Sequence, residues 1–166
     1  MVKQLFLPLI AVALFIIAVG VFTQKSGSLN FGQMIAPNTK TLKEVTVGSK
    51  TIKVEIANTA STRSKGLSGR ASLPNDTGML FVFEDKSTVP TFWMKDMLIP
   101  LDIIWIKEGK IIKIDENVPA PAKGTSDTKL QTYSPGKQID FVLEVNAGFS
   151  KNNNIKAGDS VELPTL

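Results

Sequence analysis

Charged side chains interrupt an apolar stretch in residues 91–106, TFWMKDMLIPLDIIWI, and these charges are the first candidates for chemistry. Asp102 begins a run of large apolar residues, where a carboxylate buried without a partner would destabilise the fold. It must therefore be exposed at a sheet edge, accept hydrogen bonds from loop amides, or pair with a cation. A structural tie and a role in binding or catalysis both remain open. The sequence offers three candidate cations for a pair with Asp102, which are Arg63, Arg70 and Lys95.

A second acid, Glu144, lies within the apolar segment IDFVLEVN (139–146). Side chains alternate between the two faces of a strand, so Glu144 shares its face with Val142 and Asn146. On that face the carboxylate could meet one of the two arginines of the chain.

The two arginines, Arg63 and Arg70, lie close together in a glycine-containing stretch. They could converge on one anion if the chain between them turns back, because guanidinium groups form forked hydrogen bonds with carboxylates and phosphates. They could equally hold Asp102 and Glu144 inside the protein. The sequence leaves both roles open.

The chain contains neither cysteine nor histidine. This composition excludes disulfides, thiol nucleophiles and zinc–thiolate sites, and it removes the commonest general base. A metal ion would need oxygen ligands, and no dense Asp/Asn loop with the spacing of a calcium site occurs. The sequence therefore predicts no metal site and no cofactor.

The positive charge of the chain is concentrated near its beginning. The formal net charge is +4, but Lys3, Lys25 and Lys40 precede residue 41. Residues 41–166 keep 16 of the 19 basic residues and all 15 acids, a net charge of +1. No segment carries the basic stripe expected of a nucleic-acid-binding protein, so we expect no nucleic-acid partner.

Residues 5–22 form an uncharged apolar stretch between Lys3 and Lys25. Its eighteen residues would span about 27 Å as a helix, which favours a retained membrane anchor over a cleaved signal peptide. Cleavage after Gly20 remains the alternative and would make the protein secreted or periplasmic. A single N-terminal span usually leaves its short basic end in the cytoplasm, so we expect a cell-membrane protein whose C-terminal domain lies outside the cytoplasm.

The sequence as a whole predicts a tethered β domain. Residues 1–24 are the signal anchor or signal peptide, 25–41 are a flexible tether, and 42–166 are an extracytoplasmic mainly-β domain. We expect a short helix over 59–67 and an antiparallel sandwich or barrel with seven to eight short strands and one or two short helices. The expected strands are 44–47, 51–57, 79–83, 91–95, 102–107, 110–115, 140–146 and 160–163.

A long loop at 117–138 contains Tyr133, the only tyrosine in the chain. A loop of this length is usually either functional or partly disordered, and the sequence does not separate the two. The turn residues 133–136, YSPG, would place the phenol against the body of the domain.

Several linked motifs resemble one family. The segments RSKGLSGRASLP (63–74), DTGMLFVF (76–83), FWMKDMLIPLDIIWI (92–106) and VLEVNAGF (142–149) resemble the family called domain of unknown function 192. The resemblance covers residues 42–164 and implies a small mainly-β domain, often found behind an N-terminal signal or anchor. It implies no established activity, substrate or cofactor. Members often carry Asn where this chain has Asp96, which weakens the case for a catalytic acid there.

The first functional hypothesis is a membrane-tethered extracytoplasmic binding or accessory module, with enzymatic activity left open but not favoured. Its partners would be the membrane, through residues 5–22, and an envelope sugar or peptide, for which Trp93 and Tyr133 supply flat surfaces. The candidate ligand-binding residues are Arg63, Arg70, Trp93, Lys95, Asp102, Tyr133 and Glu144.

Two alternatives remain open. An envelope glycan hydrolase would use two of Asp96, Asp102 and Glu144, with carboxyl groups about 5–5.5 Å or 6.5–9.5 Å apart in an open cleft. A structural domain of a membrane complex would instead show an exposed apolar patch and no pocket.

Overall fold

The alternating residues after position 42 form the first hairpin of the sheet. The computed structural model describes residues 42–85, 87 and 89–166. Strand β1 (Lys43–Val47) pairs antiparallel with β2 (Lys50–Ala57), and Ile52 and Val54 are buried while Lys53 is exposed. This alternation follows from the two-residue period of a strand, and it confirms the predicted strands 44–47 and 51–57.

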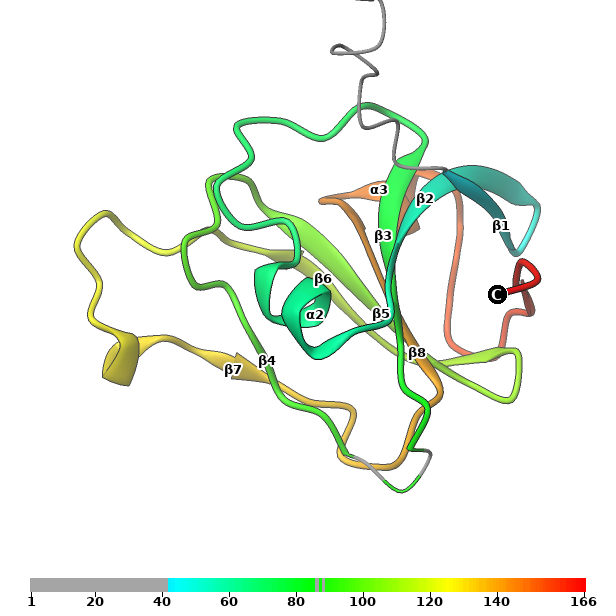
Figure 1. The fold of residues 1–166 in the computed structure, drawn as a ribbon. Helices are drawn as coiled ribbons and strands as arrows, with labels where there is room; N and C mark the ends of the chain where they lie inside the picture. The colour runs from blue at the N-terminus through cyan, green and yellow to red at the C-terminus, as the bar shows by residue number, and fades with distance from the viewer. Residues whose placement is uncertain (1–41, 86, 88) are drawn as a thin grey trace, which may run out of the picture. The chain divides into compact units, whose positions relative to one another are not determined.

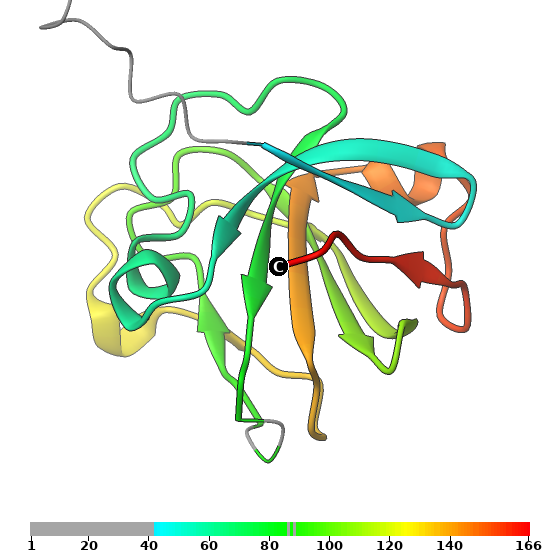
Figure 2. The same cartoon turned by 45° about the vertical axis from the view of Figure 1, so that its right-hand side comes forward.

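Seven strands form one curled sheet in the order β6-β5-β8-β3-β2-β1-β9 (Figure 1). The two ends of the sheet approach each other, because the Ile111 amide donates to the Asp159 carbonyl at 3.0 Å and the Val161 amide to Gly109 at 2.8 Å. Figure 2 shows β9 beside the β5–β6 hairpin. The result is a nearly closed, barrel-like sheet. Its further strands are β3 (Thr77–Val82), β5 (Leu101–Lys107), β6 (Lys110–Val118), β8 (Phe141–Asn146) and β9 (Val161–Glu162).

The sheet departs from the expected antiparallel order at one pair, since β2 and β3 run parallel. Parallel neighbours need a crossover connection, and residues 58–76 supply it through helix α2 (Ala60–Lys65). The side chain of Thr59 caps this helix, and Gly66 ends it with φ of 47°. The predicted helix is confirmed, and it is the connection that allows the parallel pair.

The long loop contains regular structure of its own. A two-stranded sheet joins β4 (Phe92–Trp93) to β7 (Thr132–Tyr133), and the 3-10 helix η2 (Asp127–Lys129) precedes β7. A second short helix, α3 (Phe149–Asn152), follows β8. The mainly-β class with short helices is therefore confirmed.

The central strands are buried on both faces. Leu80, Ile104 and Leu143 point into the barrel interior, where they pack with residues of β1 and β2. Their neighbours Phe81 and Trp105 point outward and are covered by the layer that carries α2 and β4, which we call the outer layer. The outer layer is therefore a second hydrophobic core on the outside of the barrel.

The predicted membrane segment 5–22 and tether 25–41 lie outside the described residues. Within the described part of the chain, no helix is long and apolar enough to cross a membrane.

Asp102 is fully buried at the beginning of β5 and accepts three backbone hydrogen bonds. The donors are the amides of Asn117 at 2.9 Å, Gly148 at 3.0 Å and Ser150 at 2.8 Å. Hydrogen bonding to loop amides is thus the alternative that the structure selects. The carboxylate ties the end of β6 and the start of α3 to β5.

Replacing Asp102 by Asn should lower the free energy of unfolding by about 2–4 kcal/mol, because the amide group brings donors to a place where three backbone donors converge. Urea denaturation of the full chain measures the change. The matched control is Asp96→Asn, at an exposed position with φ of 57° where asparagine is well tolerated. Equal stability of the two variants would contradict the tie.

Candidate functional site

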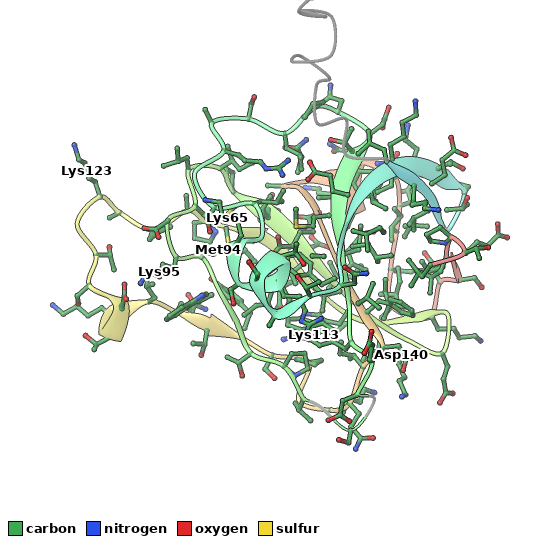
Figure 3. The ribbon with its side chains drawn as sticks, viewed as in Figure 1. Lys65, Met94, Lys95, Lys113, Lys123 and Asp140 are labelled. Carbon is green, nitrogen blue, oxygen red and sulfur yellow. The ribbon has the colours of Figure 1, made fainter. Side chains whose placement is uncertain are left out.

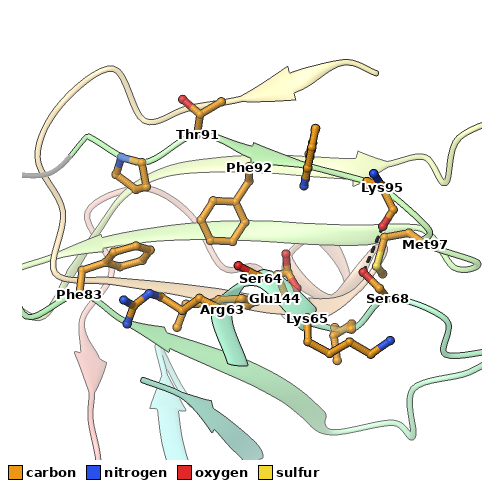
Figure 4. Close-up of a pocket in the computed structure, with 15 residues that line it drawn as sticks. Arg63, Ser64, Lys65, Ser68, Phe83, Thr91, Phe92, Lys95, Met97 and Glu144 are labelled. Carbon is orange, nitrogen blue, oxygen red and sulfur yellow. Dashed lines mark hydrogen bonds between the residues drawn. The ribbon is translucent and has the colours of Figure 1, made fainter. Parts of the chain in front are cut away.

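The outer layer encloses a pocket of about 340 Å³. One wall comes from α2 and the turn that follows it, the other comes from residues 90–93, and strands β3 and β8 form the floor. Figure 4 shows Phe92 pointing from its strand toward Ser64 and Glu144. The lining residues are Arg63, Ser64, Lys65, Gly66, Leu67, Ser68, Phe81, Phe83, Pro90, Thr91, Phe92, Trp93, Lys95, Met97 and Glu144.

Aromatic rings form the apolar part of the pocket. Phe92 packs edge-on against Phe81 at 5.0 Å and against Trp105 at 5.3 Å, and it lies 6.3 Å from Phe83. Trp93 alternates to the other face of β4 and is 50% exposed. The packed rings fix the shape of the pocket, while Trp93 offers a half-exposed flat surface at its edge.

Glu144 is a buried acid in the floor of the pocket. The alternation of β8 places it on the outer face with Val142, beneath the outer layer, and only 6% of the residue is exposed. Burial raises the pKa of its carboxyl from 4.5 to about 8, so the group is neutral at pH 7. No hydrogen bond or ion pair reaches this carboxyl from any other residue that the structure describes. The expected pairing of Glu144 with an arginine is absent there.

Glu144 is the central member of a row of three acids across the sheet. The strand register aligns Glu55, Met79, Glu144, Ile103 and Asp115 on neighbouring strands. The outer two acids have cationic partners, since Arg70 holds Glu55 through bonds of 2.5 and 2.8 Å, and Lys113 lies 3.0 Å from Asp115. Only the central acid faces the pocket.

Arg70 is thus used inside the protein. Its guanidinium binds Glu55 in the forked geometry, and the hydrogen bond to Glu55 raises its pKa above the ordinary value. Arg63 lines the pocket, but its Nη1 donates to the carbonyls of Asn58 at 2.8 Å and Val82 at 3.0 Å, and its guanidinium lies over the Phe83 ring. Arg63 therefore anchors α2 to the ends of β2 and β3. The two arginines do not converge on one anion.

Lys95 lies at the edge of the pocket. Its ammonium group pairs with Asp127 of η2 and lies 5.4 Å from the centre of the Trp93 ring. The hydrogen bond that the Lys95 ammonium donates to the Asp127 carboxylate is the main reason that the Lys95 pKa is raised. Ser68 also donates to the Lys95 carbonyl at 3.1 Å. Lys95 thus contacts three segments, which are the turn after α2, the helix η2 and Trp93 of β4.

The structure brings together four of the seven predicted site residues, which are Arg63, Trp93, Lys95 and Glu144. Arg70 and Asp102 are used in internal contacts, as described above. Tyr133 lines a different hollow of about 230 Å³ with Met94 and the 119–131 segment. Partial burial, and next the charge of Asp115, raise the Tyr133 pKa.

Sequence reasoning missed several lining residues. Phe81 and Phe83 belong to the strand MLFVF, whose apolar run indicated only a core strand. Ser64, Lys65 and Ser68 belong to the predicted helix and its end, and the helical period could have placed them together on one wall. Within the described residues no group of three or more acids is arranged to hold a metal ion.

Glu144→Gln should stabilise the fold increasingly as the pH rises. Below pH 4.5 the Glu144 carboxyl of the wild type is protonated in both the folded and the unfolded state. Between pH 4.5 and about pH 8 it is ionised in the unfolded state but still protonated in the folded state, so the free energy of unfolding of the wild type falls as the pH rises through this range. Glutamine does not ionise, so its advantage over the wild type should grow by about 1.4 kcal/mol per pH unit between about pH 5 and 8. Urea denaturation at several pH values measures this difference.

Glu162→Gln, at an exposed position of β9, is the control for removing a carboxyl group. A pH-independent difference between Glu144→Gln and the wild type would show that Glu144 is ionised in the folded protein.

Comparisons with known proteins agree with this fold. A Novosphingobium aromaticivorans DSM 12444 protein of unknown function has a TM-score of 0.66 and 28% identity, over 78% of this chain and 90% of that one. A Sinorhizobium meliloti 1021 protein, provisionally described as a transcription regulator, has a TM-score of 0.62 and 32% identity, over 72% and 89%. No curated protein matches. Residues 43–163 match the family DUF192, described as "Uncharacterized ACR", and the chain belongs to that family.

Proposed function

We propose that the domain is a binding module whose pocket beneath α2 holds a small ligand or one unit of a polymer. The observation that carries this proposal is the buried Glu144 carboxyl, which faces an aromatic-lined pocket and has no partner in the described part of the chain. The Glu144 carboxyl oxygens are not enclosed by the protein and open toward the pocket, so a ligand group there can supply the hydrogen-bond partner that the described residues do not. The volume of about 340 Å³ suits a small molecule.

The proposal includes the compartment expected from the sequence. The apolar residues 5–22 would tether the module to the cell membrane, with the domain outside the cytoplasm. An envelope sugar or peptide would then be the local source of ligands. The half-exposed ring of Trp93 supports this choice, because sugars and peptide side chains stack on flat aromatic surfaces.

The alternative of a glycan hydrolase has less support. Such an enzyme needs two carboxyl groups in one cleft. Of the three acids considered, Glu144 lines the pocket whereas Asp96 and Asp102 are not among its lining residues. Asp102 is also fully buried and accepts three amide hydrogen bonds, which removes it from contact with a substrate.

The description of the Sinorhizobium protein suggests a role in transcription. Direct contact with nucleic acid has little support in this chain, since residues 41–166 carry a net charge of only +1.

The test is a ligand screen followed by a variant at the pocket edge. Binding of envelope sugars, peptides and small metabolites to the full chain in lipid nanodiscs is measured by ligand-observed NMR. Trp93→Ala should weaken a pocket ligand by about tenfold, because it removes a stacking surface worth about 1 kcal/mol or more. Leu98→Ala is the control, since Leu98 is also an exposed apolar residue and does not line the pocket. A complete screen without a saturable ligand would contradict the proposal.

A further inference from the structure

The charges around the pocket are unbalanced. Three cations line it, Arg63, Lys65 and Lys95, whereas Glu144 is its only acid (Figure 3 labels both lysines). Asp127 offsets the charge of Lys95. Within residues 42–85, 87 and 89–166, neither Arg63 nor Lys65 forms an ion pair. The pocket therefore carries a net positive charge at pH 7, when the Glu144 carboxyl is neutral.

The remaining charged groups near Glu144 are balanced in pairs. On the β2 side of the acid row, Glu55 is bound by Arg70, and on the β6 side Asp115 is bound by Lys113. Each acid lies two strands from Glu144, which corresponds to about 10 Å. The outer layer contributes the two lysines and Arg63 described above. Among the described residues, Glu144 is the one acid that lines the pocket, and in its neutral form it does not repel a ligand anion.

We propose that this pocket selects a small anion with a flat apolar body, of the aryl carboxylate class, and that the Glu144 carboxyl donates a hydrogen bond to a carboxylate oxygen of that ligand. The inference rests on the proposed function and names the ligand class. The rings of Phe83, Phe92 and Trp93 contact the apolar body. Lys65 and Arg63 balance the negative charge. Burial makes the hydrogen bond between a neutral acid and a carboxylate strong.

A cationic ligand fits these groups less well. Aromatic rings and a carboxylate do attract ammonium groups. Here, however, an ammonium ligand would have to ionise a desolvated acid and would lie beside Arg63 and Lys65. The cations of the lining thus separate the two ligand classes.

The two classes give opposite dependence on pH. A bound anion stabilises the protonated form of Glu144, so its affinity is highest below about pH 8 and falls as the free protein loses this proton. Between pH 6.5 and pH 9 the dissociation constant of the anion should increase about tenfold. A bound ammonium stabilises the ionised form, so its affinity would rise over the same range.

Three probes with the same ring separate these outcomes: phenylacetate, 2-phenylethanol and 2-phenylethylamine. Calorimetry with the full chain in lipid nanodiscs measures the dissociation constant of each probe at pH 6.5 and 9. Nanodiscs without protein correct for partition of the probe into lipid. We expect phenylacetate to bind most tightly at pH 6.5 and to weaken about tenfold at pH 9. Tighter binding of 2-phenylethylamine, with affinity rising toward pH 9, would overturn the inference and leave the binding function intact.

Two variants assign the effect to named side chains. Glu144→Gln keeps a hydrogen-bond donor but cannot ionise. It should increase the dissociation constant of phenylacetate about two- to fivefold at pH 6.5 and abolish the dependence of that constant on pH. Lys65→Ala should increase the dissociation constant of phenylacetate about threefold and leave that of 2-phenylethanol unchanged. Lys151→Ala, at an exposed position of α3 outside the pocket lining, is the matched control. A dependence on pH that survives in Glu144→Gln would overturn the role of Glu144.

The screen of the preceding section separates the two proposals. If none of the three probes binds while another ligand shows saturable, Trp93-dependent binding, the ligand class is overturned and the binding function stands. If neither the probes nor the screen yields a ligand, both proposals fail.

Discussion

The fold depends on the fact that its central strands are apolar on both sides. In β3, β5 and β8 the residues that point into the barrel interior and those that point outward are alike buried. A sheet of this kind cannot leave either face in water, because each exposed large apolar side chain would forgo about 1.5–3 kcal/mol of burial. The curl of the sheet covers the inner face, and the outer layer of α2 and β4 covers the other. The pocket lies within this second cover.

Polar ties hold the cover in place at its edges. Arg63 fastens α2 to the carbonyls at the ends of β2 and β3, and Lys95 fastens the segment after β4 to η2. Asp102 performs the same task for the end of β6 and the chain after β8. Among the charged groups that line the pocket, Arg63 and Lys65 form no ion pair within the described residues, so their charge remains available to a ligand. Strand alternation places Glu144 at the floor, where it likewise has no partner in the described residues.

Local sequence patterns predicted much of the secondary structure, but they could not predict which distant residues pair across the sheet. Alternation and turn residues predicted the two strands of the first hairpin and the short helix over 59–67, because each depends on neighbours in sequence. The parallel β2–β3 pair depends on where the crossover returns, and no local pattern encodes that. The partner of Arg70 depends likewise on the sheet register, which brings Glu55 rather than Asp102 or Glu144 within reach. For Asp102, hydrogen bonding to loop amides was one of three alternatives, and only the fold, which brings the amides of Asn117, Gly148 and Ser150 together, decides among them.

The two-face alternation of β3 and β8 also bears on how such a domain can diversify. Leu80 and Leu143 belong to the barrel interior, whereas their neighbours Phe81 and Glu144 belong to the pocket. Substitution at a pocket position therefore leaves the interior packing of the same strand largely untouched. If the pocket binds a ligand as proposed, relatives could change ligand specificity at every second residue of these strands and keep the same fold. Similarity of fold among relatives would then be a poor guide to which ligand each one binds.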